Sequence, residues 1–281
     1  MWIWRYTLVP RRALSPLAGP RPRQGALLRD GDGFADIHPW PELGDAPLGE
    51  QLAKLARGET TPLTRRSLAM ARIDGAARSR RVSLFERLTI PPSHWPGADP
   101  PPGFDTVKLK GIERIPPGVR LRIDFNRSLS AEAFLMIAEG LPAERIDFVE
   151  DPCEYDPAVW TALREQTGLR LALDRPSECG GSPPLSAVDV LVVKPAIEEV
   201  PADSREIIIT SYMDHPVGQF GAAYVAATRP PVTCGLFTHV LYERDEFIER
   251  IRSDGARLLP PEGTGIGFDD LLERLPWKKL R

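Results

Sequence analysis

The sequence contains few of the residues that build disulfide frameworks, zinc sites or membrane spans. It has three cysteines and four histidines in 281 residues. Cys153, Cys179 and Cys234 are odd in number and lack metal-ligand spacing, which favours a reduced protein. No apolar run approaches the roughly 18 residues that a membrane helix needs, and residues 1–6 alternate like a strand rather than a signal peptide. We therefore expect a cytoplasmic protein without membrane contact.

Positive charge is not in excess either. The formal net charge is -3 and the isoelectric point is about 5.9, which gives no electrostatic reason to expect nucleic acid as a partner. Arginines cluster at 65–66 and 78–81, but Leu68 and Ala71 interrupt them at helical spacing. We interpret this stretch as the solvated face of a helix.

Proline, in contrast, is abundant, with 30 residues that often stand in pairs or triplets. Such clusters break helices and strands, so they mark the connections between elements. In the first 80 residues, the pattern between these breaks predicts short strands followed by two helices. The strands are expected at 2–9, 25–28 and 33–37, and the helices at 50–57 and 63–78.

After residue 80, apolar runs of strand length recur, and most end in a charged or polar residue. Helix-like segments at 131–141 and 157–167 lie between some of them. Buried runs that alternate with helices indicate a parallel sheet, and eight of them favour a closed α/β barrel. The eight runs are 82–88, 106–110, 121–124, 146–150, 169–174, 188–194, 207–211 and 232–235.

One connection is too short for a regular barrel. Only residues 111–120 separate Lys110 from the next strand, and they include Pro116 and Pro117. A crossover normally takes at least about 10 to 12 residues including its helix. We expect the barrel helix after Lys110 to be missing or reduced to a turn.

The strand ends carry the chemistry. Lys110, Asp124, Glu150, Asp174 and Lys194 end five successive strands, in that order. In a parallel barrel these ends converge on one face, which carries the active site. Three carboxylates brought together would raise one another's pKa unless a cation neutralises them. Oxygen ligands with room for water and substrate suit Mg²⁺, and Mn²⁺ is an alternative. Any one of these residues alone would be read as a solvated loop residue.

The lysines provide the second half of the pattern. A proton next to a carboxylate is very weakly acidic, so its removal needs a cation to hold the developing charge and a base poised near neutral pH. Lys108 lies on the same side of its strand as Lys110, two residues away. Its positive charge, together with a metal, is expected to lower the pKa of Lys110.

At these residues the sequence resembles the enolase superfamily, and within it the o-succinylbenzoate synthase family. The resemblance implies a modified (β/α)7β barrel (81–239) and an α+β capping domain (1–80, completed by 240–281). It also implies one Mg²⁺ held by Asp124, Glu150 and Asp174. The matching segments are 34–41, 107–110, 121–127, 146–152, 171–174, 192–195 and 209–211.

The resemblance also implies catalytic roles. Lys110 would remove the proton α to the substrate carboxylate and then, protonated, assist departure of the β-hydroxyl in a syn elimination. Lys194 would stabilise the enediolate from across the substrate, which is 2-succinyl-6-hydroxy-2,4-cyclohexadiene-1-carboxylate in this family. Substrate-binding positions implied in the same way are Arg122, Asn126, Ser211 and Gly235, of which the last two would hold the succinyl carboxylate.

The sequence departs from the family pattern at three places, one of which is the short link after Lys110. Arg175 and Pro176 follow Asp174, where relatives usually carry Glu-Ser, and residues 212–216 replace a serine-rich stretch. The same lysine pair also occurs in relatives that racemise N-acylamino acids or epimerise dipeptides, so a racemase or epimerase activity stays open for this chain. A non-catalytic relative that binds a carboxylate or a metal also stays open. The expected partner is a small carboxylate, and the oligomeric state, monomer or dimer, stays open.

Two minor patterns complete the sequence. The four histidines are scattered without zinc spacing, and we interpret them as structural or surface residues, with His215 near the active face as the exception. Residues 263–267 resemble a glycine-rich phosphate loop but follow two prolines and no β/α unit, so we expect a C-terminal loop there.

Overall fold

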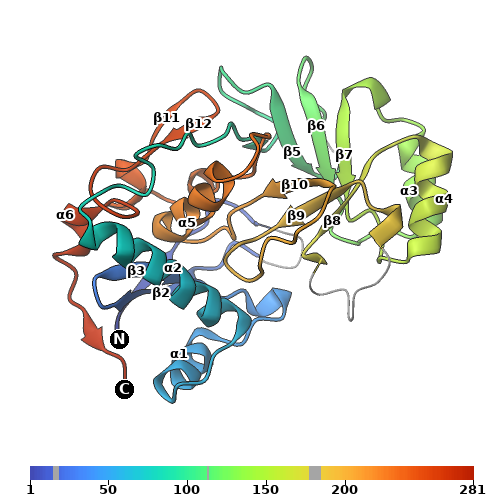
Figure 1. The fold of residues 1–281 in the computed structure, drawn as a ribbon. Coiled ribbons are helices and arrows are strands. Elements are labelled where there is room, and N and C mark those ends of the chain that lie inside the picture. The colour runs from blue at the N-terminus through green and yellow to red at the C-terminus, as the bar shows by residue number, and fades with distance from the viewer. Residues whose placement is uncertain (15–18, 113, 177–184) are drawn as a thin grey trace.

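The structure, a computed structural model, describes residues 1–14, 19–112, 114–176 and 185–281. Figure 1 shows a cap, built from the first elements of the chain and its last segment, beside a curved parallel sheet, and it places the two chain ends next to each other. Among the described residues, no helix is both long and apolar enough to span a bilayer.

The cap contains an antiparallel sheet in the order β13-β1-β2-β3. Strands β2 and β3 bury apolar side chains, such as Leu28 and Ile37, against two helices. The second helix begins with a capping box between Thr61 and Thr64, with Pro62 in its first turn. The elements are β1 (Trp2–Leu8), β2 (Arg23–Asp30), β3 (Gly33–Ile37), α1 (Leu48–Ala56), α2 (Pro62–Ser79) and β13 (Lys278–Lys279).

The second sheet is parallel throughout, in the order β10-β9-β8-β7-β6-β5-β4. Isolated parallel bridges close it into a barrel, because Cys234 pairs with Ser93 and Gly235 pairs with Thr210. The eighth predicted run, 232–235, thus contributes to the barrel as single bridges. The strands are β4 (Trp95–Pro96), β5 (Thr106–Lys110), β6 (Arg120–Asp124), β7 (Ile146–Glu150), β8 (Leu171–Asp174), β9 (Val190–Val193) and β10 (Glu206–Ile209).

The prediction of a strand at 82–88 was wrong, and β4 takes its place at the start of the barrel. Residues 82–84 pair instead with the C-terminal segment, where Leu84 N donates to Gly265 O and Gly265 N donates to Val82 O. The apolar side chain of Phe85 is buried against Phe220. Only Phe85 of this run is buried, and periodicity cannot distinguish such a partly apolar loop from a strand.

Few helices cover the barrel. They are α3 (Ala131–Ala138), α4 (Pro157–Thr167) and α5 (Pro216–Ala227). Among the described residues of the link from β5 to β6 there is no helix, which confirms that prediction, and the link from β9 to β10 has none either. The remaining elements are short: η1 (Pro41–Leu43), η2 (Ala143–Arg145), η4 (Leu185–Ala187), η5 (His239–Leu241), η6 (Ile248–Arg250), β11 (Arg252–Asp254), β12 (Arg257–Leu259) and α6 (Asp269–Leu272).

The C-terminal segment packs against the first elements of the chain, within the cap. Pro10 forms a bridge with Tyr242, and Leu280 N donates to Met1 O at 3.1 Å. The glycine-rich residues 263–267 form a loop that packs on α2, where Ile266 N donates to Asp74. The assignment of 1–80 with 240–281 to a capping domain and of 81–239 to the barrel domain stays a prediction, with which these contacts agree.

Candidate active site

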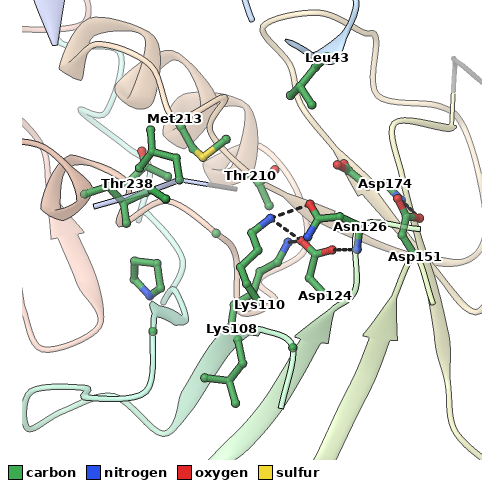
Figure 2. A pocket seen from close by; sticks show the side chains of 18 of the residues that line it. Leu43, Lys108, Lys110, Asp124, Asn126, Asp151, Asp174, Thr210, Met213 and Thr238 are labelled. Carbon is green, nitrogen blue, oxygen red and sulfur yellow. Dashed lines mark hydrogen bonds and ion pairs between the residues drawn. The ribbon is translucent and has the colours of Figure 1, made fainter. Parts of the chain in front are cut away.

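A cavity of about 670 Å³ lies where the carboxyl ends of the barrel strands face the cap. Barrel residues form its floor and sides, and residues of the loop 40–45 contribute from the cap. Figure 2 shows Lys108, Lys110 and Asp124 pointing toward one another, with Asp174 and Asp151 on the neighbouring strand ends. Four of the five predicted strand-end residues line this cavity, and Glu150 lies beneath them.

The sheet register brings the first carboxylates together. Lys110 is paired with Asp124, and Asp124 is paired with Glu150, across β5, β6 and β7. Lys108 lies between the two acids, because its Nζ is 3.0 Å from Asp124 Oδ2 and 2.6 Å from Glu150 Oε2. Lys110 Nζ reaches Asp124 Oδ2 at 2.9 Å and Asn126 Oδ1 at 3.0 Å. Its side chain is 39% exposed and is open to the cavity.

The third carboxylate has its own lysine. Asp174 ends β8, and Lys194 follows β9, the next strand of the sheet. The Lys194 ammonium forms an ion pair with Asp174 Oδ1, and its backbone N donates to Glu198 at 3.1 Å. Lys194 therefore borders the carboxylate group on one side, while Lys108 and Lys110 border it on the other.

The charges of the nearby lysines affect the pKa of each of the three acids. Burial alone would lower the pKa of Lys108, but the charges of Asp124, Glu150 and Asp174 raise it above its ordinary value. Burial acts to raise the pKa of Asp124, but the positive charges of Lys108 and Lys110 have the larger effect and lower this pKa overall. Burial, followed by the charge of Asp124, raises the pKa of Glu150.

Asp174 behaves like Asp124. Burial acts to raise its pKa, but the charges of Lys194 and Lys108 lower it overall. Lys108 thus appears among the groups that act on every one of the three acids. The site contains three carboxylates whose charges must be balanced together: Asp124 and Glu150 are buried, and Asp174 is 18% exposed.

This donor set fits a hard divalent cation. Buried carboxylates on successive strands, with space for substrate above them, are the ligands that Mg²⁺ prefers. As the side chains stand among the described residues, no group of three acidic, histidine or cysteine side chains is arranged around one metal position. The ammonium groups of Lys108 and Lys194 lie against these carboxylates.

The predicted substrate-binding residues do not all reach the cavity. Asn126, Ser211 and Gly235 line it, but Arg122 does not. The Arg122 guanidinium is buried and donates to Asp147 at 2.8 Å and to Thr233 O at 2.8 Å. These contacts favour a structural role for Arg122, which links β6 to β7 and to the closing segment of the barrel.

Several residues of the cavity were not predicted from the sequence, among them Trp40, Arg127, Asp151, Arg175 and Met213. Positive backbone φ angles mark four strand ends beside the cavity: Asn126 (50°), Asp151 (45°), Arg175 (50°) and Met213 (50°). Such conformations are uncommon outside glycine and cluster at functional sites. No residue-type signal would have found Arg175 or Met213, because neither is a usual residue for this conformation.

Asp151 is an acid that the strand-end pattern passes over. Burial, followed by the charge of Asp174, raises the pKa of Asp151 to about 8. Its side chain accepts from Asp174 N at 3.1 Å and from Arg127 at 3.2 Å. Asp151 therefore fixes the backbone at the end of β8 and orients Asp174.

Comparison with known proteins identifies the family. Residues 1–77 match the family described as "O-succinylbenzoate synthase, N-terminal domain". The chain is 33% identical to an o-succinylbenzoate synthase of Bdellovibrio bacteriovorus, over 98% of this chain and 97% of that protein. The chain belongs to the o-succinylbenzoate synthase family. As a member of this family it is an enzyme, a carbon–oxygen lyase.

Solved structures share the fold of this member of the o-succinylbenzoate synthase family. A dipeptide epimerase from Enterococcus faecalis, complexed with Mg and L-Leu-L-Tyr, has a TM-score of 0.73 and 14% identity, covering 94% of this chain and 97% of that one. An enolase superfamily member from Roseovarius nubinhibens, complexed with magnesium, also has a TM-score of 0.73, with 15% identity and coverage of 98% and 96%. At these identities the likeness concerns the fold, a modified (β/α)7β barrel with a cap.

Proposed function

We propose that this protein is an o-succinylbenzoate synthase of menaquinone biosynthesis. It removes water from 2-succinyl-6-hydroxy-2,4-cyclohexadiene-1-carboxylate and releases 2-succinylbenzoate. The observation that carries this proposal is a carboxylate group with Lys108 and Lys110 on one side and Lys194 on the other, in a cavity that the cap covers. The arrangement suits proton abstraction next to a carboxylate, which needs a base and fixed positive charge together.

Asp124, Glu150 and Asp174 are the residues that would hold one divalent cation, Mg²⁺ or alternatively Mn²⁺. When bound, the cation supplies positive charge for the substrate carboxylate and for the negative charge that develops on it. Lys108 touches two of these acids and adds a fixed positive charge beside Lys110.

Lys110 carries out both proton transfers. Its neutral Nζ takes the proton from the carbon next to the carboxylate, and Asp124 and Asn126 hold that nitrogen in place. Lys194 places its ammonium near the enediolate from the other side of the cavity. The protonated Lys110 then gives its proton to the β-hydroxyl, the C–O bond breaks, and water leaves from the same face. The ring becomes aromatic, and Lys110 is neutral again.

The test is whether the protein, with Mg²⁺, converts the cyclohexadiene substrate to 2-succinylbenzoate. Product formation is monitored by ultraviolet absorbance. We expect Lys110→Ala to abolish turnover, a loss of at least about 10³-fold that is typical for a general base, and to retain the fold and binding of Mn²⁺. Lys54→Ala is the matched control, since Lys54 is an exposed lysine on α1 paired with Glu50. Activity that persists in Lys110→Ala would refute the base assignment, and absence of product with the native chain would refute the function.

Racemisation of an N-acylamino acid, or epimerisation of a dipeptide, is the second candidate. It is favoured by the positions of Lys110 and Lys194 on opposite sides of the carboxylate group, because a racemase needs a proton donor on each face of the substrate. Exchange of the α-proton of N-succinylamino acids in deuterated water would detect it. The same lysine pair argues against a purely binding relative, which has no use for two ammonium groups against its metal ligands.

A further inference from the structure

The proposed substrate carries two carboxylates, and the cavity residues expected to hold the second one are uncharged. Ser211 Oγ lies 2.6 Å from Thr238 Oγ1, so one hydroxyl of this pair is engaged by the other. Gly235 N already donates to Ile209 O at 2.9 Å. A methyl group at Gly235 would lie 2.6 Å from the Thr210 methyl and 2.8 Å from the His94 ring. Gly235 therefore provides space rather than a donor.

A desolvated carboxylate needs a charged partner, and four arginines line the cavity in its described part. Arg12 is exposed and donates to Pro96 O. Arg114 is 68% exposed and pairs with Asp99 at the rim. Arg127 is paired with Asp151. The fourth, Arg175, is 13% exposed, so water screens its charge least.

Arg175 lies between the reaction centre and the cap. Its backbone follows Asp174 with φ 50°, and its N donates to Val192 O at 3.2 Å. Its Nε is 3.8 Å from Asp174 Oδ2, and its NH1 donates to Leu43 O at 3.1 Å. The guanidinium thus spans from the carboxylate group to the loop 40–45. In Figure 2, Leu43 lies well apart from Lys108 and Lys110, beyond Asp174.

The loop 40–45 also connects Arg175 to the opposite wall. Trp40 Nε1 donates to Tyr212 O at 2.8 Å, and Tyr212 OH donates to Asp45 at 3.0 Å. Tyr212 is the neighbour of Ser211 in the chain. The loop 40–45 therefore contacts both Arg175 and Tyr212, the residue next to Ser211 in the chain.

We propose that Arg175 binds the second, succinyl carboxylate of the substrate and sets the specificity for a dicarboxylate. This inference rests on the proposed function. The planar guanidinium offers paired donors that match a carboxylate. A ligand that lacks the second carboxylate loses this charge-assisted contact and binds more weakly.

The test compares two ligands by calorimetry in the presence of Mg²⁺: 2-succinylbenzoate and 2-butanoylbenzoate, which lacks the second carboxylate. We expect the native chain to bind 2-succinylbenzoate about 10- to 100-fold more tightly, the range of one charge-assisted contact. Arg175→Ala and the similarly shaped Arg175→Gln should lose this preference, and Arg175→Lys should retain part of it. In turnover, the loss should appear mainly in KM. Arg114→Ala is the control and should keep the preference.

The outcomes separate the two proposals. If the native chain fails to bind 2-succinylbenzoate, the proposed function is refuted, and the inference that rests on it is refuted as well. If the native chain prefers 2-succinylbenzoate and Arg175→Gln prefers it equally, only the inference is refuted. The last readout is the affinity for Mn²⁺, measured by electron paramagnetic resonance. A parallel loss of Mn²⁺ affinity in Arg175→Gln would mean that Arg175 acts by positioning Asp174, and would also refute the inference.

Discussion

Asp214 is a buried carboxyl group that the proposed reaction does not use. It lies beside Asp36, since a methyl group at Gly218 would lie 2.6 Å from Asp214 Oδ2 and 2.7 Å from Asp36 Oδ2. Asp36 accepts from Tyr6 OH at 2.7 Å and from His215 N at 3.1 Å. Asp214 Oδ1, in contrast, has no hydrogen-bond partner within the described part of the chain. Burial raises the pKa of Asp214 to about 7.

This raised pKa gives a prediction for stability against pH. A carboxyl group whose pKa is higher in the folded state binds more protons there, so stability falls as pH rises from the ordinary value of 3.8 toward about 7. Asp214→Asn removes the ionisation. We expect little change in stability at pH 4 and a gain at pH 8 that reaches at most about 4 kcal/mol. Urea unfolding at several pH values measures it, and an equal effect at both extremes would contradict it.

Residue type and position were enough to predict that Lys110, Lys194 and the three acids lie together, because each stands at or next to the end of a strand and the order of strands follows the sequence. The same reasoning could not find Arg175 or Trp40. Arg175 is one arginine among many in the sequence, and its importance comes from a contact with Leu43, 132 positions away. Arg122 was predicted to bind substrate because it lies in a matching segment, but it does not line the cavity.

At the scale of elements, local signals determined what could be predicted. The helix expected at 157–167 has those bounds, because Asp156 caps its start and Gly168 ends it in a left-handed conformation. β4 could not be predicted, since it contains two residues, one of them a proline, and exists only through pairing with β5. The helix α5 buries most of its residues, including Gln219 and Phe220, and was not expected from its sequence.

The packing of α2 on β3 provides a prediction at this scale. A methyl group at Gly33 would lie 1.8 Å from Ala71 O, a backbone atom of α2. Gly33→Ala must therefore push the helix from the sheet, and we expect a loss of about 1–3 kcal/mol in the free energy of unfolding. Urea unfolding monitored by circular dichroism measures the loss.

Gly49 supplies the matched control for Gly33. It lies inside α1, and a methyl group there would meet nothing within 4 Å. Gly49→Ala should increase stability by about 0.5–1 kcal/mol, because alanine favours the helix. Equal effects of the two substitutions would mean that the close approach of α2 to β3 does not contribute to stability.

At the scale of the molecule, the active site depends on how the cap meets the barrel. The sequence could predict both parts separately, since one shows strands and helices of its own and the other shows repeated β/α units. Their contact could not be predicted, because it joins residues 40–45 to the ends of β8 and β10 through a few hydrogen bonds. No periodic pattern encodes such contacts.

Trp40 is the residue at which this contact can be tested. Its ring is fully buried, and Arg23 stacks on it with 4.4 Å from the guanidinium carbon to the ring centre. Trp40→Phe keeps an aromatic ring but removes the donor to Tyr212 O. A lost buried hydrogen bond costs about 1 kcal/mol, and it leaves the loop 40–45 less firmly placed over the cavity. We expect kcat/KM to fall about tenfold, corresponding to about 1.4 kcal/mol.

Trp160→Phe separates this effect from a general loss of stability. Trp160 is also fully buried, and its Nε1 donates to Glu154 O at 3.2 Å, but it lies on α4 and does not line the cavity. Both substitutions should lower the melting temperature by a few degrees, on the order of 2–4 °C for about 1 kcal/mol in a chain of this size. Only Trp40→Phe should lower kcat/KM. An equal loss of activity in Trp160→Phe would show that turnover follows overall stability, and the cap loop would then have no particular role in holding the substrate.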